Sequence, residues 1–280
     1  MSFPSPSRSA DPSRRSLDGG ALAAALTSDS SLWRSVRVVD EVGSTNADLL
    51  AAAADDAPEG TVLVAEYQAS GRGRLDRTWV SPPGAGLTVS LLLRPDVPAA
   101  RRGWLPLLTG VALAEAVGEV PGVRASLKWP NDLLDAGGAK LAGILAEVGS
   151  GAVVVGVGLN VSTTVGELPP GGTSLALAAG RPVDRAAVLL AFLRGLERRY
   201  LPWVAGLGDP VSTGLARDYL AWSSTVGSTV AVALPDGSTL EGVAESVDWD
   251  GRLVVRTAQG RVELASGDVR HVRTGSTGTV

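Results

Sequence analysis

Residues 140–160 read KLAGILAEVGSGAVVVGVGLN, and the class of fold follows from them. Two apolar runs, 140–148 and 152–159, are joined by Gly149, Ser150 and Gly151, the residue types of a tight hairpin turn. The strands of a hairpin are antiparallel. The sheet that contains them is therefore expected to be at least partly antiparallel.

Apolar patterns on either side of this hairpin predict further strands and helices. Strands are expected at 33–42, 61–67, 86–93 and 124–129. Helices are expected at 18–26, 47–54, 102–118, 184–200 and 211–222. In the helix at 102–118, Trp104, Leu107, Leu108 and Val111 recur at helical spacing, which predicts an amphipathic helix.

The pattern of the chain changes after Ser223. Short alternating apolar runs follow, separated by turn residues such as Asp236-Gly237 and Asp250-Gly251. They predict a small β-barrel of about 50 residues, too small to be the catalytic body. Residues 1–30 are rich in Ser, Pro and Arg, which predicts a disordered tail with a short helix. The expected domains are this tail, a catalytic domain at 31–222 and the barrel at 223–275.

Composition excludes several classes of site. The chain has no cysteine and one histidine, His271, so disulfides, thiolate chemistry, a Ser-His-Asp triad and a histidine zinc site are not expected. A net charge of -4 gives no global basic field for nucleic acid or anionic lipid, so anion binding must be local. No apolar run is long enough for a membrane span, and the faint twin-arginine pattern at 13–17 lacks an apolar region behind it. A cytoplasmic location is expected.

A loop at 68–79 reads QASGRGRLDRTW and follows the apolar run at 61–67. Glycine lets a backbone approach a ligand closely, and the three arginines carry planar forks suited to carboxylate and phosphate. Only two of the 25 basic residues are lysines, Lys128 and Lys140. All other basic residues are arginine, so the use of lysine at these two positions suggests that both sites require a compact ammonium group.

Five clusters fall near the ends of the expected strands: GSTN at 43–46, the loop at 68–79, KWPND at 128–132, KLAGI at 140–144 and GVGLN at 156–160. Each alone has a structural explanation, such as an N-cap at Ser44, a strand-ending turn, packing glycines, or a loop that is solvated or grips RNA backbone. Together they gather the hydroxyls, amide and cations needed to bring a carboxylate into contact with a nucleotide triphosphate. That chemistry needs neither histidine nor cysteine.

In these motifs and their order, the sequence resembles the biotin–protein ligases (biotin–[biotin carboxyl carrier protein] ligases) from about Trp33 to Val272. The resemblance implies an α+β fold: a mixed β-sheet flanked by helices, like that of class II aminoacyl-tRNA synthetases, followed by a C-terminal SH3-like β-barrel. It implies that biotin and ATP, with Mg²⁺, form biotinyl-5′-AMP. A lysine of a biotin carboxyl carrier protein, a subunit of acyl-CoA carboxylases, would then accept the biotin.

The resemblance also implies roles for single residues. The catalytic pair would be Lys140, at the carboxylate and the α-phosphate, and Arg72. The biotin-binding residues would be Ser44, Thr45 and Gln68 at the ureido head, with Gly71, Arg72, Lys140, Gly143 and Gly156. The ATP-binding residues would be Arg74, Arg77, Trp79, Asn131 and Asn160, with Trp79 beside the adenine. Mg²⁺ would be held largely by the ATP phosphates, and no protein ligand for a metal is expected.

The sequence departs from the family in two places. Residues 1–30 leave no room for the helix-turn-helix of members that double as repressors, so no specific DNA binding is expected. Leu75-Asp76 replaces a more usual Arg/His-Gly pair, and a carboxylate beside Arg74 and Arg77 puts the closure of the loop in question.

Two alternatives stay open. A lipoate–protein ligase has a related fold and the same reaction logic, although the Gly-Arg loop and the Ser-Thr pair favour a ureido substrate. A nucleic-acid-binding module would use the loop to grip backbone, which the acidic pI disfavours. The sequence leaves open the oligomeric state, the carrier that is recognised and the contribution of the barrel. An edge strand in the 140–159 hairpin could support dimerisation or carrier docking.

Overall fold

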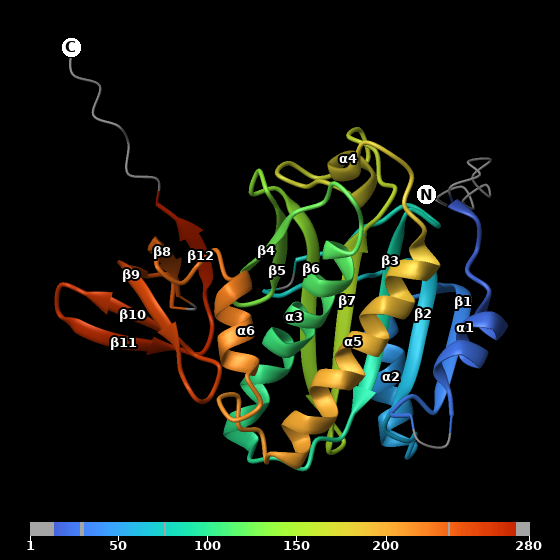
Figure 1. Ribbon diagram of the computed structural model, residues 1–280, viewed down its shortest axis with the longest axis horizontal. Helices are drawn as coiled ribbons and strands as arrows, with labels where there is room; N and C mark the ends of the chain where they lie inside the picture. Colours follow the sequence, from blue (N-terminus) through green and yellow to red (C-terminus); the bar gives the residue numbers. More distant parts are fainter. Residues whose placement is uncertain (1–13, 29–30, 76, 235, 273–280) are drawn as a thin grey trace.

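The computed structural model describes residues 14–28, 31–75, 77–234 and 236–272 (Figure 1). Its helices are α1 (Gly19–Leu26), α2 (Thr45–Ala54), the 3₁₀ helix η2 (Ala99–Gly103), α3 (Trp104–Gly118), α4 (Leu175–Ala179), α5 (Arg185–Ala205) and α6 (Leu215–Trp222). The strands of the main sheet are β1 (Ser35–Val42), β2 (Thr61–Gln68), β3 (Gly86–Leu93), β4 (Ala125–Lys128), β5 (Asp132–Asp135), β6 (Lys140–Gly149) and β7 (Ala152–Asn160). Five further strands form a C-terminal sheet: β8 (Thr229–Ala233), β9 (Thr239–Val247), β10 (Leu253–Thr257), β11 (Gly260–Leu264) and β12 (Asp268–His271).

The main sheet has seven strands in the order β1-β2-β3-β7-β6-β5-β4. Only β1 and β2 are parallel, with α2 as the crossover between them, and all other neighbours are antiparallel. The hairpin predicted from 140–160 is β6–β7, and its turn residues Ser150 and Gly151 both have positive φ. The mixed, partly antiparallel sheet expected from the sequence is therefore confirmed.

Alternate residues of the central strands enter two different cores. On β2, Val62 and Val64 join the large core with α3 and α5, whereas Leu63 packs with Leu49 and Ala53 of α2. Figure 1 shows α3 and α5 side by side over one face of the sheet. Because successive side chains of a strand point to opposite faces, α2 covers the other face.

Helix α3 is buried on nearly all sides, and the expectation of an amphipathic helix was wrong. Twelve of its residues are buried, including Thr109 and Gly110. The sheet covers one side of α3 and the helices α5 and α6 cover another, so no polar face is needed. The helix predicted at 211–222 begins later, at Leu215, and the short α4 was not predicted.

The C-terminal sheet is antiparallel, with strand order β11-β10-β9-β8-β12. Strands β8 to β11 coincide with alternating apolar runs of the sequence, and β12 is an addition. Val230, Val232 and Val269 belong to the same continuous core as the main sheet. In the described residues the ladders form an antiparallel sheet with β11 and β12 at its two edges.

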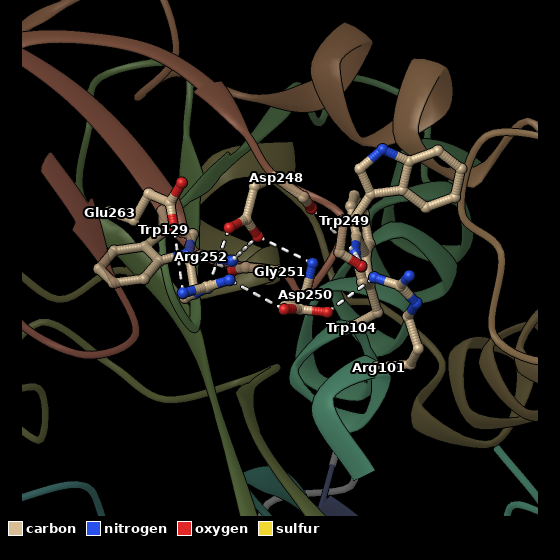
Figure 2. A network of polar contacts seen from close by, with 9 residues as sticks. All are labelled: Arg101, Trp104, Trp129, Asp248, Trp249, Asp250, Gly251, Arg252 and Glu263. Carbon is tan, nitrogen blue, oxygen red and sulfur yellow. Dashed lines mark hydrogen bonds and ion pairs between the residues drawn. The ribbon is translucent and has the colours of Figure 1, made fainter. Parts of the chain in front are cut away.

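The C-terminal sheet is fastened to the start of α3 by the turn between β9 and β10 (Figure 2). The indole nitrogen of Trp104 donates to the carbonyls of Asp248 and Trp249, and that of Trp129 donates to the carbonyl of Gly251. Arg101 pairs with Asp250 at 2.7 Å. The two backbones approach so closely that a Cβ on Gly103 would lie 2.2 Å from the Asp250 carbonyl oxygen.

Residues 14–28 pack on the catalytic body, so the expectation of disorder up to residue 30 was wrong for this part. Arg14 forms two hydrogen bonds to the carboxylate of Glu167, and the Leu17 amide donates to Glu66. The predicted short helix is α1, capped by Asp18. The rest of the predicted tail, residues 1–13, 29 and 30, lies outside the described residues.

The hairpin β6–β7 lies inside the sheet, not at its edge as suggested from the sequence. β7 has β3 and β6 as neighbours, and β6 has β7 and β5. However, β5 pairs only with the first part of β6, up to Gly143. No helix in the described ranges is long and apolar enough to cross a bilayer.

Candidate active site

The candidate site lies on the sheet face that α2 covers, beyond the N-terminal end of that helix. Val154 of β7 packs under α2, and two strand positions further along Gly156 and then Gly158 face the same side. The register places Gly158 beside Gly143 of β6. Because these positions carry no side chain, the sheet has a hollow there, a cavity of about 180 Å³.

One end of the cavity is formed by the first turn of α2. Ser44 is the N-cap of α2, as its position in the sequence suggested. It also lines the cavity. The backbone amide and hydroxyl of Thr45 both donate to Oε1 of Gln68, at 2.8 and 2.9 Å. This fixes the amide of Gln68 with its oxygen toward α2, and leaves the Nε2 donors for a ligand.

A chain of polar side chains continues from Thr45 under the cavity. Ser90 Oγ lies 2.7 Å from the hydroxyl of Thr45 and 2.6 Å from Oδ1 of Asn46. Nδ2 of Asn46 donates to Oε2 of Glu147 at 2.7 Å, and Oε1 of Glu147 lies 3.3 Å from Nη2 of Arg72. The end that contains Gln68 is thus connected to a cation of the Gly-Arg loop.

The Gly-Arg loop folds over the glycine-lined floor. Trp79 packs directly on the strand backbones, since a Cβ on Gly158 would lie 2.3 Å from its indole ring. Gly71 is buried beneath the loop, where a Cβ would lie 2.4 Å from the Trp79 carbonyl oxygen. The loop is closed by hydrogen bonds between Gly71 and Trp79 and between Gly73 and Arg77.

Cations line the other end of the cavity, and carboxylates accompany them. Lys140 Nζ lies 2.6 Å from Oδ1 of Asp132, and Arg77 lies 2.5 Å from Oδ2 of Asp268. Arg74 donates to the side-chain oxygen of Asn131 and to the Gly267 carbonyl, both at 3.3 Å. Gly267 and Asp268 belong to the C-terminal domain, which therefore forms part of the wall.

The pKa values of three groups at this end of the cavity, Arg74, Arg77 and Asp268, differ from their ordinary values. Burial lowers the pKa of Arg74 from its ordinary value, against the opposing effects of Asp132 and Asp268. The hydrogen bond to Asp268 raises the pKa of Arg77. Burial raises the pKa of Asp268, but Arg77, with Lys128 and Arg270, outweighs burial and leaves it below its ordinary value. Arg77 and Asp268 therefore each favour the charged form of the other.

The sequence of this chain is similar to those of known proteins. Residues 40–163 match the Biotin/lipoate A/B protein ligase family, and residues 225–272 match the Biotin protein ligase C terminal domain. The biotin–[acetyl-CoA-carboxylase] ligase of Mycobacterium tuberculosis is 43% identical over 265 residues, which cover 93% of this chain and 97% of that protein.

The chain belongs to the biotin protein ligase family. A bifunctional ligase/repressor of Bacillus subtilis is 34% identical over 239 residues, 82% of this chain and 72% of that protein. The biotin protein ligase of Aquifex aeolicus, solved in complex with biotin and ATP, superposes with a TM-score of 0.70 at 27% identity. That match covers 84% of this chain and 98% of the solved one.

This biotin protein ligase brings together most of the residues singled out from its sequence. The predicted residues that line the cavity are Ser44, Thr45, Gln68, Arg72, Arg74, Arg77, Trp79, Asn131, Lys140, Gly143 and Gly156. Two predicted residues lie behind it: Gly71 supports the loop, and Asn160 is buried with its amide donating to the Thr173 carbonyl. The effect of Asp76 on loop closure cannot be followed, because Asp76 lies outside the described residues.

Sequence reasoning missed four polar residues of the site: Asn46, Asp132, Glu147 and Asp268. Asn46 and Asp132 stand inside quoted motifs and were given no role. Glu147 could have been found from strand alternation, because it faces the same side as Gly143. Asp268 carries no local signal, since only the docking of the C-terminal sheet brings it to the loop.

Proposed function

We propose that this protein is an ATP-dependent biotin–protein ligase that acts in two steps. The carboxylate oxygen of biotin attacks the α-phosphate of MgATP, which forms biotinyl-5′-AMP and releases pyrophosphate. The amine of a lysine on a carrier protein then attacks the acyl carbon, so an amide bond forms, AMP leaves and the amine loses a proton. The first step brings two anions together at phosphorus, and the second brings an amine to the acyl carbon, so positioning and charge compensation supply most of the catalysis.

One observation carries this proposal: a single cavity has neutral hydrogen-bonding groups at one end and cations at the other. Thr45 and Gln68 lie at the first end, and Lys140 and Arg72 line the same cavity. A ureido head needs short donors and acceptors, whereas a carboxylate and a phosphate need positive charge. The Aquifex aeolicus relative, solved with biotin and ATP, supports this assignment of substrates.

We assign the biotin side as follows. Ser44, Thr45 and the Nε2 group of Gln68 bind the ureido head, and Gly156 and Gly143 line the cavity beside the ring and tail. Lys140 meets the carboxylate and the α-phosphate, with Arg72 as the second cation. Asp132 holds the Lys140 ammonium in the cavity at 2.6 Å until the ligand arrives.

We assign the nucleotide to the end beside the C-terminal domain. Arg74, Arg77 and Asn131 lie there, and Trp79 presents an indole face against which an adenine can stack. Asn160 supports the nucleotide site indirectly. Its side-chain amide donates a hydrogen bond to the Thr173 carbonyl in the loop that follows β7. Mg²⁺ enters as part of MgATP: in the described ranges no three His, Cys, Asp or Glu side chains are placed to bind a metal ion.

The wider assignments are proposals on the same basis. The sheet is proposed to be of the class II aminoacyl-tRNA synthetase type, and the C-terminal sheet an SH3-like barrel, with domain limits at 31–222 and 223–275. The acceptor is proposed to be the biotin carboxyl carrier subunit of an acyl-CoA carboxylase, as the name of the Mycobacterium tuberculosis relative suggests. The reaction uses ATP, so we place it in the cytoplasm. The absence of specific DNA binding stays a prediction.

The test is to mix the protein with biotin, MgATP and a carrier domain and to measure the mass of the carrier. The expected result is the mass increase of one biotinyl group on one lysine, together with biotin-dependent pyrophosphate exchange. The same mixture with lipoic acid in place of biotin is expected to give no transfer. The proposal fails if neither transfer nor exchange occurs, or if lipoic acid is the better substrate.

A further inference from the structure

Glu147 is the carboxylate that the loop cation Arg72 meets in this structure, at 3.3 Å. The Arg72 side chain is 48% exposed and that of Glu147 is 25% exposed. Ion pairs this open to water contribute little to folding stability. The pair therefore calls for a role other than holding the fold together, and Arg72 lines the cavity.

Glu147 is held by a buried neighbour, whereas the Arg72 side chain is about half exposed. Asn46 is buried, and its Nδ2 group donates to Oε2 of Glu147 and to the Leu145 carbonyl. Gly156 makes room for this amide, since a Cβ there would lie 2.3 Å from Oδ1 of Asn46. The pair can therefore open by movement of the exposed arginine, while the carboxylate stays in place.

The same pairing recurs around the cavity. Lys140 faces Asp132, and Arg77 faces Asp268. Among the four cations that line the cavity, the fourth is Arg74, which donates to Asn131 and to a backbone carbonyl. Three of the four cations that line the cavity are thus paired with a carboxylate.

We infer that Glu147 is a positioning residue that stands in for the anionic group of the ligand. It holds Arg72 beside the cavity until the carboxylate of biotin, or the phosphate of the adenylate, takes its place. The inference rests on the proposed function. Anion binding then exchanges one ion pair for another, so it is weaker than binding to an unpaired arginine would be. A ligand without the negative charge makes no such exchange.

The test compares biotin with its alcohol analogue, in which a hydroxyl replaces the carboxylate, by titration calorimetry on the full chain. In Glu147→Gln the amide oxygen can still accept from Asn46, but Arg72 loses its anionic partner. Biotin is expected to bind about two- to fivefold more tightly, the range that corresponds to losing a competing half-exposed ion pair. The alcohol is expected to bind with unchanged Kd, and high salt is expected to reduce the difference for biotin.

A matched control is Glu245→Gln. Glu245 pairs with Arg256 and Arg261 on the C-terminal sheet and is 22% exposed, so the same charge is removed from a similar setting away from the cavity. This control is expected to leave both Kd values as in the wild type. It thereby separates the local exchange from a general change of net charge.

The inference is overturned if Glu147→Gln leaves biotin binding unchanged or weakens it, or if both ligands shift alike. An equal shift would mean that Glu147 only shapes the cavity. Failure of the proposed function looks different: the wild type itself would bind no biotin and transfer none, which overturns both proposals. A wild type that biotinylates the carrier while Glu147→Gln shows wild-type Kd values overturns the inference alone.

Discussion

Glycines, which carry no side chain, shape this site as much as its polar side chains do. On β7, Val154 packs under α2, while Gly156 and Gly158 on the same side of the strand leave the floor open. Asn46 occupies the space over Gly156, and Trp79 occupies the space over Gly158. Since the neighbouring atoms are already in place, the glycines are required by space and not by backbone conformation.

Gly156→Ala is expected to weaken biotin binding. The added Cβ would lie 2.3 Å from Oδ1 of Asn46, so the amide must shift and disturb its bonds to Ser90 and Glu147. Overpacking of this kind amounts to about 1–3 kcal/mol, and the KM for biotin is expected to rise about tenfold or more. Gly166→Ala is the control, because a Cβ there meets nothing within 4 Å. Equal KM values for the two variants would contradict the steric argument.

Lys140→Ala is expected to abolish formation of the adenylate with the fold intact. The ammonium is the cation nearest Asp132, and its loss leaves both that carboxylate and the ligand anions without compensation. A contact of this kind is worth about 2–4 kcal/mol in the transition state, or about two to three orders of magnitude in rate. Biotin-dependent pyrophosphate exchange measures it, and circular dichroism checks the fold. Exchange within a few-fold of the wild type would remove Lys140 from the chemistry.

At the scale of elements, the N-terminal segment fastens one wall of the site. The loop that follows β7 carries Pro169, which lines the cavity, and its residues Gly171 and Thr173 bond to the backbone of Lys140. Glu167, in the middle of this loop, receives two hydrogen bonds from Arg14. The ordered part of the predicted tail therefore supports the position of Lys140.

The Arg14–Glu167 contact is expected to make stability depend on acid pH. The hydrogen bond from Arg14 lowers the pKa of Glu167 from 4.5 to about 2 in the folded protein. A group whose pKa is lowered by folding stabilises the fold above its unfolded pKa and stops doing so as pH falls through the folded value. The difference in Tm between wild type and Glu167→Gln is thus expected to be full above pH 4.5 and to vanish near pH 2. A difference independent of pH would contradict this assignment.

At the scale of the whole molecule, the C-terminal domain forms part of the wall of the candidate site. Its β9–β10 turn is bonded to Trp104, Trp129 and Arg101, and the segment after β11 places Gly267 and Asp268 against the Gly-Arg loop. The junction is held by hydrogen bonds and an ion pair, whose strength depends on direction and distance. It therefore fixes the distance between the domain and the loop arginines.

Trp129→Phe is expected to raise the KM for ATP with the Kd for biotin unchanged. The variant removes the hydrogen bond to the Gly251 carbonyl, which loosens the domain that holds Asp268 near Arg77. Trp203→Phe is the matched control: Trp203 is equally buried, but its indole nitrogen has no hydrogen-bond partner in the described structure. Both variants replace an indole by a smaller ring. The unfolding free energy lost in Trp129→Phe minus that lost in Trp203→Phe therefore measures the hydrogen bond, which is worth about 1 kcal/mol. Equal KM values for ATP would show that the junction does not position the nucleotide loop.

Local patterns predicted most of the strands and helices and the cluster of site residues. Apolar runs with hairpin turns predict β6 and β7 well, because the turn chemistry and the period of two act within a few residues. The same reasoning failed for α3, since the burial of a helix on every side depends on what α5 and α6 cover. It also failed for residues 14–17, whose partners Glu66 and Glu167 are distant in the chain.

The sequence by itself determined the antiparallel hairpin and the family to which the motifs belong, and it predicted that the loop at 68–79 binds an anion. Only the tertiary structure decided which carboxylates accompany the cations. Glu147, Asp132 and Asp268 come from three different strands, and Asp268 comes from another domain. Ion pairs depend on distance in space, which local sequence does not encode when the partners lie up to 191 residues apart.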